Sequence, residues 1–264
     1  MEAEELVRRC VNYISENLDK DLTVEQIAEA LNYSARHLGR VFLHYTGFTI
    51  GEYIRTAKAA RAARALMQRL CVAEAAVACG YGTSSNLDHA FGGVYGVSPS
   101  RYFGAAGLPV IECFLPITVA GYVLRRVAAA DEQTGLALWH GYDFSKVDPD
   151  DFNVASPEGG AEVGVWTEID GEKCYLFGVC CQYDAEIPAG MVRCMLPAGR
   201  YAMFLVPEAE NTHELSENIR AALEPALEQS AGLGNYEPVL GAPVMEYYHG
   251  KETYLCVPIR EREA

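Results

Sequence analysis

Arg36 and Arg40 are the first residues of this chain whose type and spacing allow a specific chemistry. Side chains at positions i and i+4 of a helix lie on one face, so if Leu38 and Phe42 are buried, the two arginines point outward. Arginine forms bidentate hydrogen bonds with guanine edges in the major groove of DNA. The candidate DNA contacts of this segment are Ser34, Arg36, His37 and Arg40.

A second group of polar residues, Ser85, Asn86 and His89, repeats this arrangement further along the chain. Asparagine can pair bidentately with an adenine edge. His89 occupies the place of Arg40, however, and Asp88 beside it repels phosphate. We therefore expect the second group to bind DNA more weakly than the first.

Glu246 is a candidate ligand-binding residue, because it lies in an apolar segment, 243–248, that has the alternation of a strand. A buried carboxylate needs a cationic partner from the protein or from a ligand. Aromatic faces beside a poorly solvated carboxylate can hold an organic cation. The candidate ligand contacts are Tyr122, Trp139, Trp166, Tyr201, Glu246 and Tyr248.

Motifs typical of enzymes are missing from the sequence. It contains no GxSxG, no GxGxxG after a strand and no HExxH. The nine cysteines include no CxxC pair at zinc-ligand spacing, which favours free thiols in a reducing compartment. We predict no catalytic residues, no metal site and no cofactor.

The elements that position the polar groups occur twice. Leu38, Phe42, Gly47, Thr49 and Tyr53 return 49 positions later as Leu87, Phe91, Gly96, Ser98 and Tyr102. Thr23 with Gln26, and Thr49 with Glu52, have the spacing of capping boxes that begin helices. Glycine at 47 and 96 suits the left-handed residue that ends a helix. The pattern predicts two helix-turn-helix units joined by a long helix over about 49–69, roughly 30 Å in length.

Charge is divided unevenly along the chain. The formal net charge is -15, yet residues 1–105 carry 11 basic and 11 acidic residues, so the excess of acid lies in the remainder. Within 32–72, seven basic residues accompany one acidic residue, Glu52. This basic segment favours contact with a polyanion such as DNA.

The spacings SxxxLxRxF and GxTxxxY, the basic linker helix and GYxxxSxLxxxFxxxYGVSPxxY resemble the double helix-turn-helix domain of the AraC family of transcription regulators over residues 8–104. The resemblance implies binding to double-stranded promoter DNA. His89 and Lys58 stand where the family commonly has arginine, and the first of these departures affects how strongly the second unit binds.

Residues 104–109 are small and turn-forming, as in a linker. After them the sequence pattern becomes that of an α+β protein. The segments with strand character are 110–124, 162–168, 173–181, 191–206, 243–248 and 253–259, with helical stretches near 131–143 and 212–230. Their order suggests two strand-helix-strand-strand units. We predict a multidomain chain, with an all-α DNA-binding domain at 1–105 and a duplicated α+β domain at 106–264.

Three segments of the second half, 196–204, 245–247 and 254–259, resemble the GyrI-like effector-binding domain over 110–260. The resemblance implies a duplicated fold with a central cleft lined by aromatics. It also implies a glutamate, at the place of Glu246, that meets cationic or lipophilic aromatic compounds. A Trp-Leu-Pro stretch usual in that family is replaced by 231–234, which leaves the shape of the pocket open.

The leading hypothesis is a ligand-responsive transcription regulator, not an enzyme, with promoter DNA and a small-molecule effector as partners and RNA polymerase open as a further one. An acidic start and the absence of an apolar run of about 18 residues predict a cytoplasmic protein without membrane contact.

Two alternative functions remain for the C-terminal half. The first is a hydrolase in which Glu246 and a neighbouring tyrosine activate water, as suggested for stand-alone relatives of that domain. The second is an acidic protein-interaction module.

Overall fold

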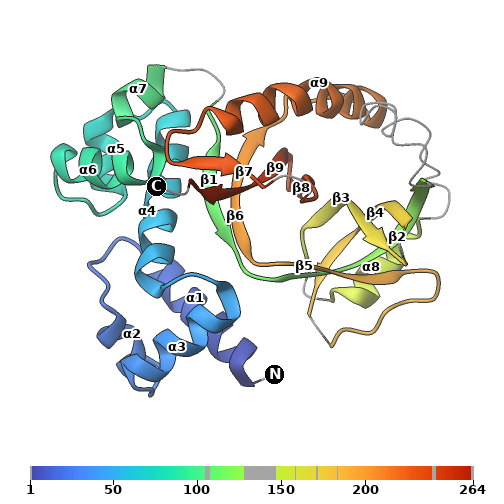
Figure 1. Cartoon of the computed structure of the whole chain (residues 1–264), viewed down its shortest axis with the longest axis horizontal. Helices are drawn as coiled ribbons and strands as arrows, with labels where there is room; N and C mark the ends of the chain where they lie inside the picture. Colours follow the sequence, from blue (N-terminus) through green and yellow to red (C-terminus); the bar gives the residue numbers. More distant parts are fainter. Residues whose placement is uncertain are drawn as a thin grey trace.

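The computed structural model describes residues 2–104, 108–127, 147–157, 159–170, 172–182, 184–239 and 242–262. The first part of the described chain is helical, with α1 (Glu2–Glu16), α2 (Val24–Ala30), α3 (Ala35–Thr46), α4 (Ile50–Met67), α5 (Val72–Ala78), α6 (Ser84–Tyr95) and α7 (Pro99–Gly104). Helices α1 to α3 gather around one end of α4 and α5 to α7 around the other (Figure 1).

The predicted helix ends are confirmed. Thr23 and Thr49 each accept a hydrogen bond from the backbone of the third helical residue, and Gln26 and Glu52 reach back to the cap backbone. Gly47 and Gly96 end α3 and α6 with φ of 75° and 68°, a conformation that glycine adopts without a steric penalty.

The rest of the described chain forms one antiparallel sheet with flanking helices. Its strands are β1 (Val110–Phe114), β2 (Ile117–Val127), β3 (Glu162–Ile169), β4 (Glu172–Cys181), β5 (Val192–Leu196), β6 (Gly199–Leu205), β7 (Tyr236–Pro238), β8 (Met245–His249) and β9 (Glu252–Glu261). Two helices accompany them, α8 (Pro149–Ala155) and α9 (Thr212–Ala231). The strand order is β1-β6-β9-β8-β3-β4-β2-β5, with β7 beside β9. The predicted helix near 131–143 lies outside the described residues.

Two predicted strands are each divided into two. The run 110–124 breaks after Phe114 and the run 191–206 breaks after Leu196. The register nevertheless continues across both breaks: Val110 pairs with Met203, and Gly121 pairs with Val192. The two long segments therefore form a bent antiparallel ribbon that connects the two ends of the strand order.

The buried hydrophobic residues form two clusters, and the division between them falls inside α4. One cluster contains residues 6–54, the first helix-turn-helix unit with its preceding helix. The other begins at Ala59 and joins the second half of α4, the second helix-turn-helix unit and the sheet. Alanines at 59, 60, 62 and 63 are all buried, because α4 is covered on several sides there. The second unit and the sheet therefore share one core.

None of the helices in the described ranges has the length and apolar character needed to cross a membrane.

Candidate nucleic-acid interface and candidate ligand site

The first unit presents its arginines on α3. Ser34 caps the helix, because its Oγ accepts a hydrogen bond from the His37 backbone N–H at 3.2 Å. Leu38 and Phe42 are fully buried, as the spacing predicts, and Arg36 and Arg40 are exposed. The imidazole of His37 is half-buried and stacks on Tyr33, with 5.5 Å between ring centroids. The two arginines are therefore the freest of the four predicted contacts.

The second unit presents Ser85, Asn86 and His89 on the exposed side of α6. The hydroxyl of Thr83 caps the helix by accepting from the Asn86 backbone N–H at 3.2 Å. The side-chain amide of Asn86 donates to the Tyr81 carbonyl oxygen at 3.1 Å. The same nitrogen carries a second N–H, so this hydrogen bond by itself does not prevent bidentate pairing with an adenine edge.

Part of the basic segment is used inside the protein. Lys58 donates to the Lys20 carbonyl oxygen at 2.8 Å and lies over the ring of Tyr81. Arg64 forms an ion pair with Glu112 of β1 at 2.5 Å. The other basic residues of 32–72 are exposed: Arg36, Arg40, Arg55, Arg61 and Arg69. The charge available to DNA is therefore smaller than the composition of the segment indicates.

Glu246 lies on β8 between β3 and β9, where Gly164 and Leu255 are its cross-strand partners. It is 1% exposed. Its Oε2 accepts hydrogen bonds from the hydroxyls of Tyr175, at 2.9 Å, and Tyr248. Its Oε1 is buried and has no hydrogen-bond partner among the described residues. Burial raises the pKa of Glu246 to about 7, although the two tyrosine hydrogen bonds act in the opposite direction.

Further aromatic rings pack against the two tyrosines that contact this carboxyl group. Trp166 and Tyr175 lie 5.5 Å apart between ring centroids, and Phe177 lies 5.9 Å from both Tyr248 and Phe152 of α8. The indole Nε1 of Trp166 is buried and, in the described part of the chain, lacks an acceptor. One orphaned acceptor and one orphaned donor therefore belong to the same group of side chains.

The strand register decides which predicted ligand residues share a face. Cross-strand partners point to the same side of a sheet. Trp166 pairs with Tyr175, and Tyr122 pairs with Phe177, so both lie on the face of Glu246 and Tyr248. The hydroxyl of Tyr122 also donates to Asp151 of α8.

Tyr201 does not belong to this face, contrary to its place among the predicted ligand residues. It pairs with Pro258, and Tyr254, four residues earlier on β9, pairs with Tyr247. Tyr201 therefore shares the side of Tyr247, opposite Tyr248. Its ring lies 5.1 Å from Phe114, which also contacts Tyr247. Trp139, another predicted ligand residue, lies outside the described residues.

Sequence reasoning missed Tyr175, Phe177 and Gly164. A Cβ on Gly164 would lie 2.7 Å from Glu246 Oε2 and closer still to the Tyr175 hydroxyl, so only glycine leaves room for the pair. A glycine inside a strand often marks such a close approach, and that is the signal that could have identified it.

Gly164→Ala is therefore expected to destabilise the fold by about 1–3 kcal/mol through overpacking. Thermal unfolding of the full chain measures this. Gly92→Ala is the control: a Cβ there meets nothing within 4 Å, and alanine favours α6, so this variant should gain up to about 1 kcal/mol. Equal stability of the two variants would contradict the proposed packing around Glu246.

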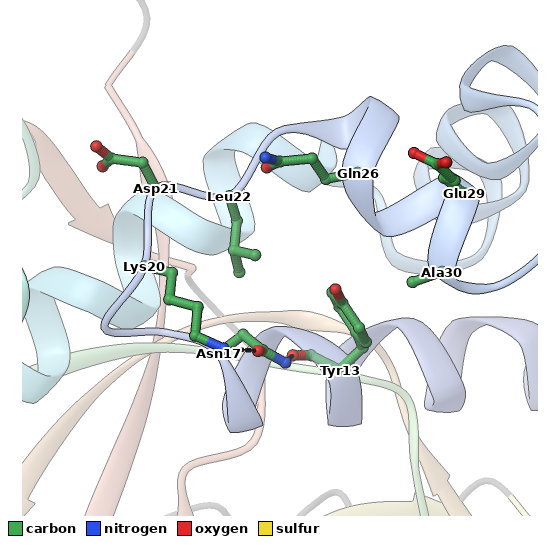
Figure 2. A pocket seen from close by; sticks show the side chains of 8 residues that line it. All are labelled: Tyr13, Asn17, Lys20, Asp21, Leu22, Gln26, Glu29 and Ala30. Carbon is green, nitrogen blue, oxygen red and sulfur yellow. Dashed lines mark hydrogen bonds between the residues drawn. The ribbon is translucent and has the colours of Figure 1, made fainter.

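A pocket of about 370 Å³ lies elsewhere, between α1 and α2 of the first unit (Figure 2). It is lined by Tyr13, Asn17, Lys20, Asp21, Leu22, Gln26, Glu29 and Ala30. Lys20 donates to Asn17 Oδ1 at 2.7 Å, and Gln26 Oε1 accepts from the Thr23 backbone at 2.9 Å, so these polar groups serve the local fold. In the described ranges no group of three or more residues could hold a metal ion.

Comparisons with known proteins found similarities to parts of this chain. A family described as a helix-turn-helix domain matches residues 27–105. The multiple antibiotic resistance protein MarA of Escherichia coli K12 is 30% identical over 100 residues, which is 36% of this chain and 76% of MarA. The C-terminal domain of AraT, a response regulator from Geobacillus stearothermophilus, has 33% identity and a TM-score of 0.36, covering 38% of this chain and 84% of its own. The structure of SAV2435 bound to tetraphenylphosphonium has 17% identity and a TM-score of 0.42, covering 57% and 92%.

Proposed function

Because this chain belongs to the AraC family of DNA-binding transcription regulators, we propose that it is a ligand-responsive member that reads promoter DNA with both helix-turn-helix units. In this proposal residues 1–105 form the DNA-binding domain. Residues 106–264 form a duplicated, GyrI-like effector domain. Its repeated units are β2-α8-β3-β4 and β6-α9-β8-β9, and its effector is a small cationic or lipophilic aromatic compound.

The length of α4 supports reading by both units. Its 18 residues extend about 27 Å at about 1.5 Å per residue. Units at its two ends can therefore approach successive major grooves, which are about 34 Å apart on one face of B-DNA. A single chain could then make the contacts that simple repressors make as dimers.

The buried carboxyl group of Glu246 carries the effector proposal. A buried carboxylate that lies beside aromatic rings and has one unpaired oxygen attracts a cation more strongly than it attracts a neutral molecule. The unpaired indole N–H of Trp166 adds a second requirement, because it can donate to an acceptor on the same ligand. The effector proposed here is an aromatic organic cation that also carries a hydrogen-bond acceptor.

Selection of genomic DNA fragments by the purified full-length protein, with and without a panel of aromatic cations, tests both parts. We expect enriched promoter fragments whose enrichment changes with some cations and not with their uncharged isosteres. The chain has two tryptophans, so a Trp139→Phe variant leaves Trp166 as the fluorescent reporter of binding. Enrichment that no cation changes, together with unaltered Trp166 fluorescence, would leave DNA binding intact and refute the effector proposal.

A further inference from the structure

Arg200 of β6 is a largely buried cation at the junction of the sheet and the first helix-turn-helix unit. Its side chain is only 11% exposed. On the sheet side it forms an ion pair with Glu261 at 2.8 Å and lies over the ring of Tyr236. On the helical side its guanidinium carbon lies 5.0 Å from the ring centroid of Phe48, and Nη2 lies 3.8 Å from Glu52 Oε1.

The partners of Arg200 in the helical part are not peripheral. Phe48 is buried in the first hydrophobic cluster, directly after Gly47 ends α3. Glu52 closes the capping box that begins α4. One side chain of the C-terminal part therefore contacts both the end of the arginine-bearing helix and the start of the linking helix.

The second unit is attached to the sheet differently. It shares the core of the sheet, and three hydrogen bonds add to that contact: Ile111 N–H donates to Tyr95 Oη at 2.9 Å, Tyr102 Oη donates to the Pro109 carbonyl at 3.2 Å, and Asn235 donates to the Gly93 carbonyl at 3.0 Å. The first unit has a separate hydrophobic core. Cys113 of β1 and Leu115, which follows β1, pack against that core and are partly buried. Polar contacts at Arg200 therefore contribute more to the position of the first unit than to that of the second.

We infer that Arg200 is a positioning residue for DNA recognition, which fixes the first helix-turn-helix unit relative to the second. The inference rests on the proposed use of both units on DNA. Its consequence is that the C-terminal domain, and not α4 alone, determines which distance between the two half-sites of an operator the protein accepts.

The local charges give the reason why removal of Arg200 should release the first unit. Glu52 and Glu261 reach the same guanidinium from opposite sides. Without the cation the two carboxylates repel each other, and the rings of Phe48 and Tyr236 each lose a cation–π contact. The ion pair of Arg64 with Glu112 lies on a different strand and persists.

The test compares the DNA affinity of the full-length wild type with that of Arg200→Met on two duplexes. The first is the best duplex that the wild-type protein selects from a random library. The second has about 5 additional base pairs, half a helical turn, between the two half-sites. The wild type should lose about tenfold or more in affinity on the altered duplex, while Arg200→Met should lose less than about threefold. Arg260→Met is the control, because Arg260 pairs with Glu237 on the exposed side of the same sheet.

A second variant keeps the test independent of folding. Glu52→Gln retains a residue that suits a capping box and removes the charge that faces Arg200. It should relax the spacing preference in the same direction, whereas Glu74→Gln, at the equivalent position of the exposed α5 capping box, should not. If both Arg200→Met and Glu52→Gln keep the wild-type preference, the role of Arg200 is refuted. If the wild type itself ignores the insertion, the proposed reading by two units fails instead.

Discussion

Arg36→Ala and Arg40→Ala should each weaken specific DNA binding by about 1–3 kcal/mol, with a relaxed preference at the base pair that each arginine reads. Both side chains are exposed on a helix whose buried residues, Leu38 and Phe42, fix its orientation. Arginine is held to guanine by two parallel hydrogen bonds, so Arg40→Lys should lose much of the discrimination while keeping the charge. Titration of the selected duplex and of its single-base variants measures both effects.

His89→Ala provides the comparison within the second unit, and its cost should be about 1 kcal/mol or less. His89 occupies the place of Arg40, beside the exposed Asp88. Arg260→Ala, which removes an exposed arginine from the sheet, controls for the loss of one positive charge. Losses of equal size at positions 36, 40 and 89 would show that the two units contribute equally and that our ranking is wrong.

The helical half could be predicted almost entirely, because its signals are local. A capping box requires residues only three apart, and the left-handed glycines are one residue beyond the helices that they end. The arginine-bearing face followed from the same short-range periodicity. The internal use of Lys58 and Arg64 could not be predicted, since their partners, Lys20 and Glu112, are 38 and 48 residues away.

The surroundings of Glu246 were predictable only along its own strand. Alternation placed Glu246 and Tyr248 on one face, and they are in contact. Tyr175 is 71 residues from Glu246, and its hydrogen bond depends on the pairing of β8 with β3 and of β3 with β4. The side on which Tyr201 lies depends on the register across three strands, which composition does not encode. The division of the buried clusters inside α4 was not predictable for the same reason, since it depends on the packing of the second half of α4 against the sheet.

Glu246→Gln should abolish the response to aromatic cations while leaving DNA binding in the absence of effector unchanged. The amide keeps the shape of the side chain and can still accept from Tyr175 and Tyr248, but it carries no charge to attract a cation. Fluorescence titration of Trp166 measures cation binding, and retardation of the selected duplex measures DNA binding. Glu252→Gln is the matched control, because Glu252 accepts a hydrogen bond from Tyr254 at 2.8 Å in an exposed position.

The raised pKa of Glu246 also predicts how the stability of the fold depends on pH. The folded-state pKa of about 7 exceeds the ordinary value of 4.5, so the contribution of this group to stability is complete below about pH 4.5 and is lost as the pH rises through about 7. The shift corresponds to about 3 kcal/mol, so Glu246→Gln should be more stable than the wild type at pH 8 and similar to it at pH 4.5.

Cation affinity should follow the opposite course, because only the carboxylate attracts the ligand. Below about pH 7 the affinity should rise about tenfold per pH unit, and above that value it should level off, with about one proton released per cation bound on the acidic side. Parallel titrations in buffers of different ionisation enthalpy detect that proton. A cation affinity that is independent of pH between 5 and 8, in the wild type as in Glu246→Gln, would mean that the effector binds at another place and that the buried carboxyl group serves only the fold.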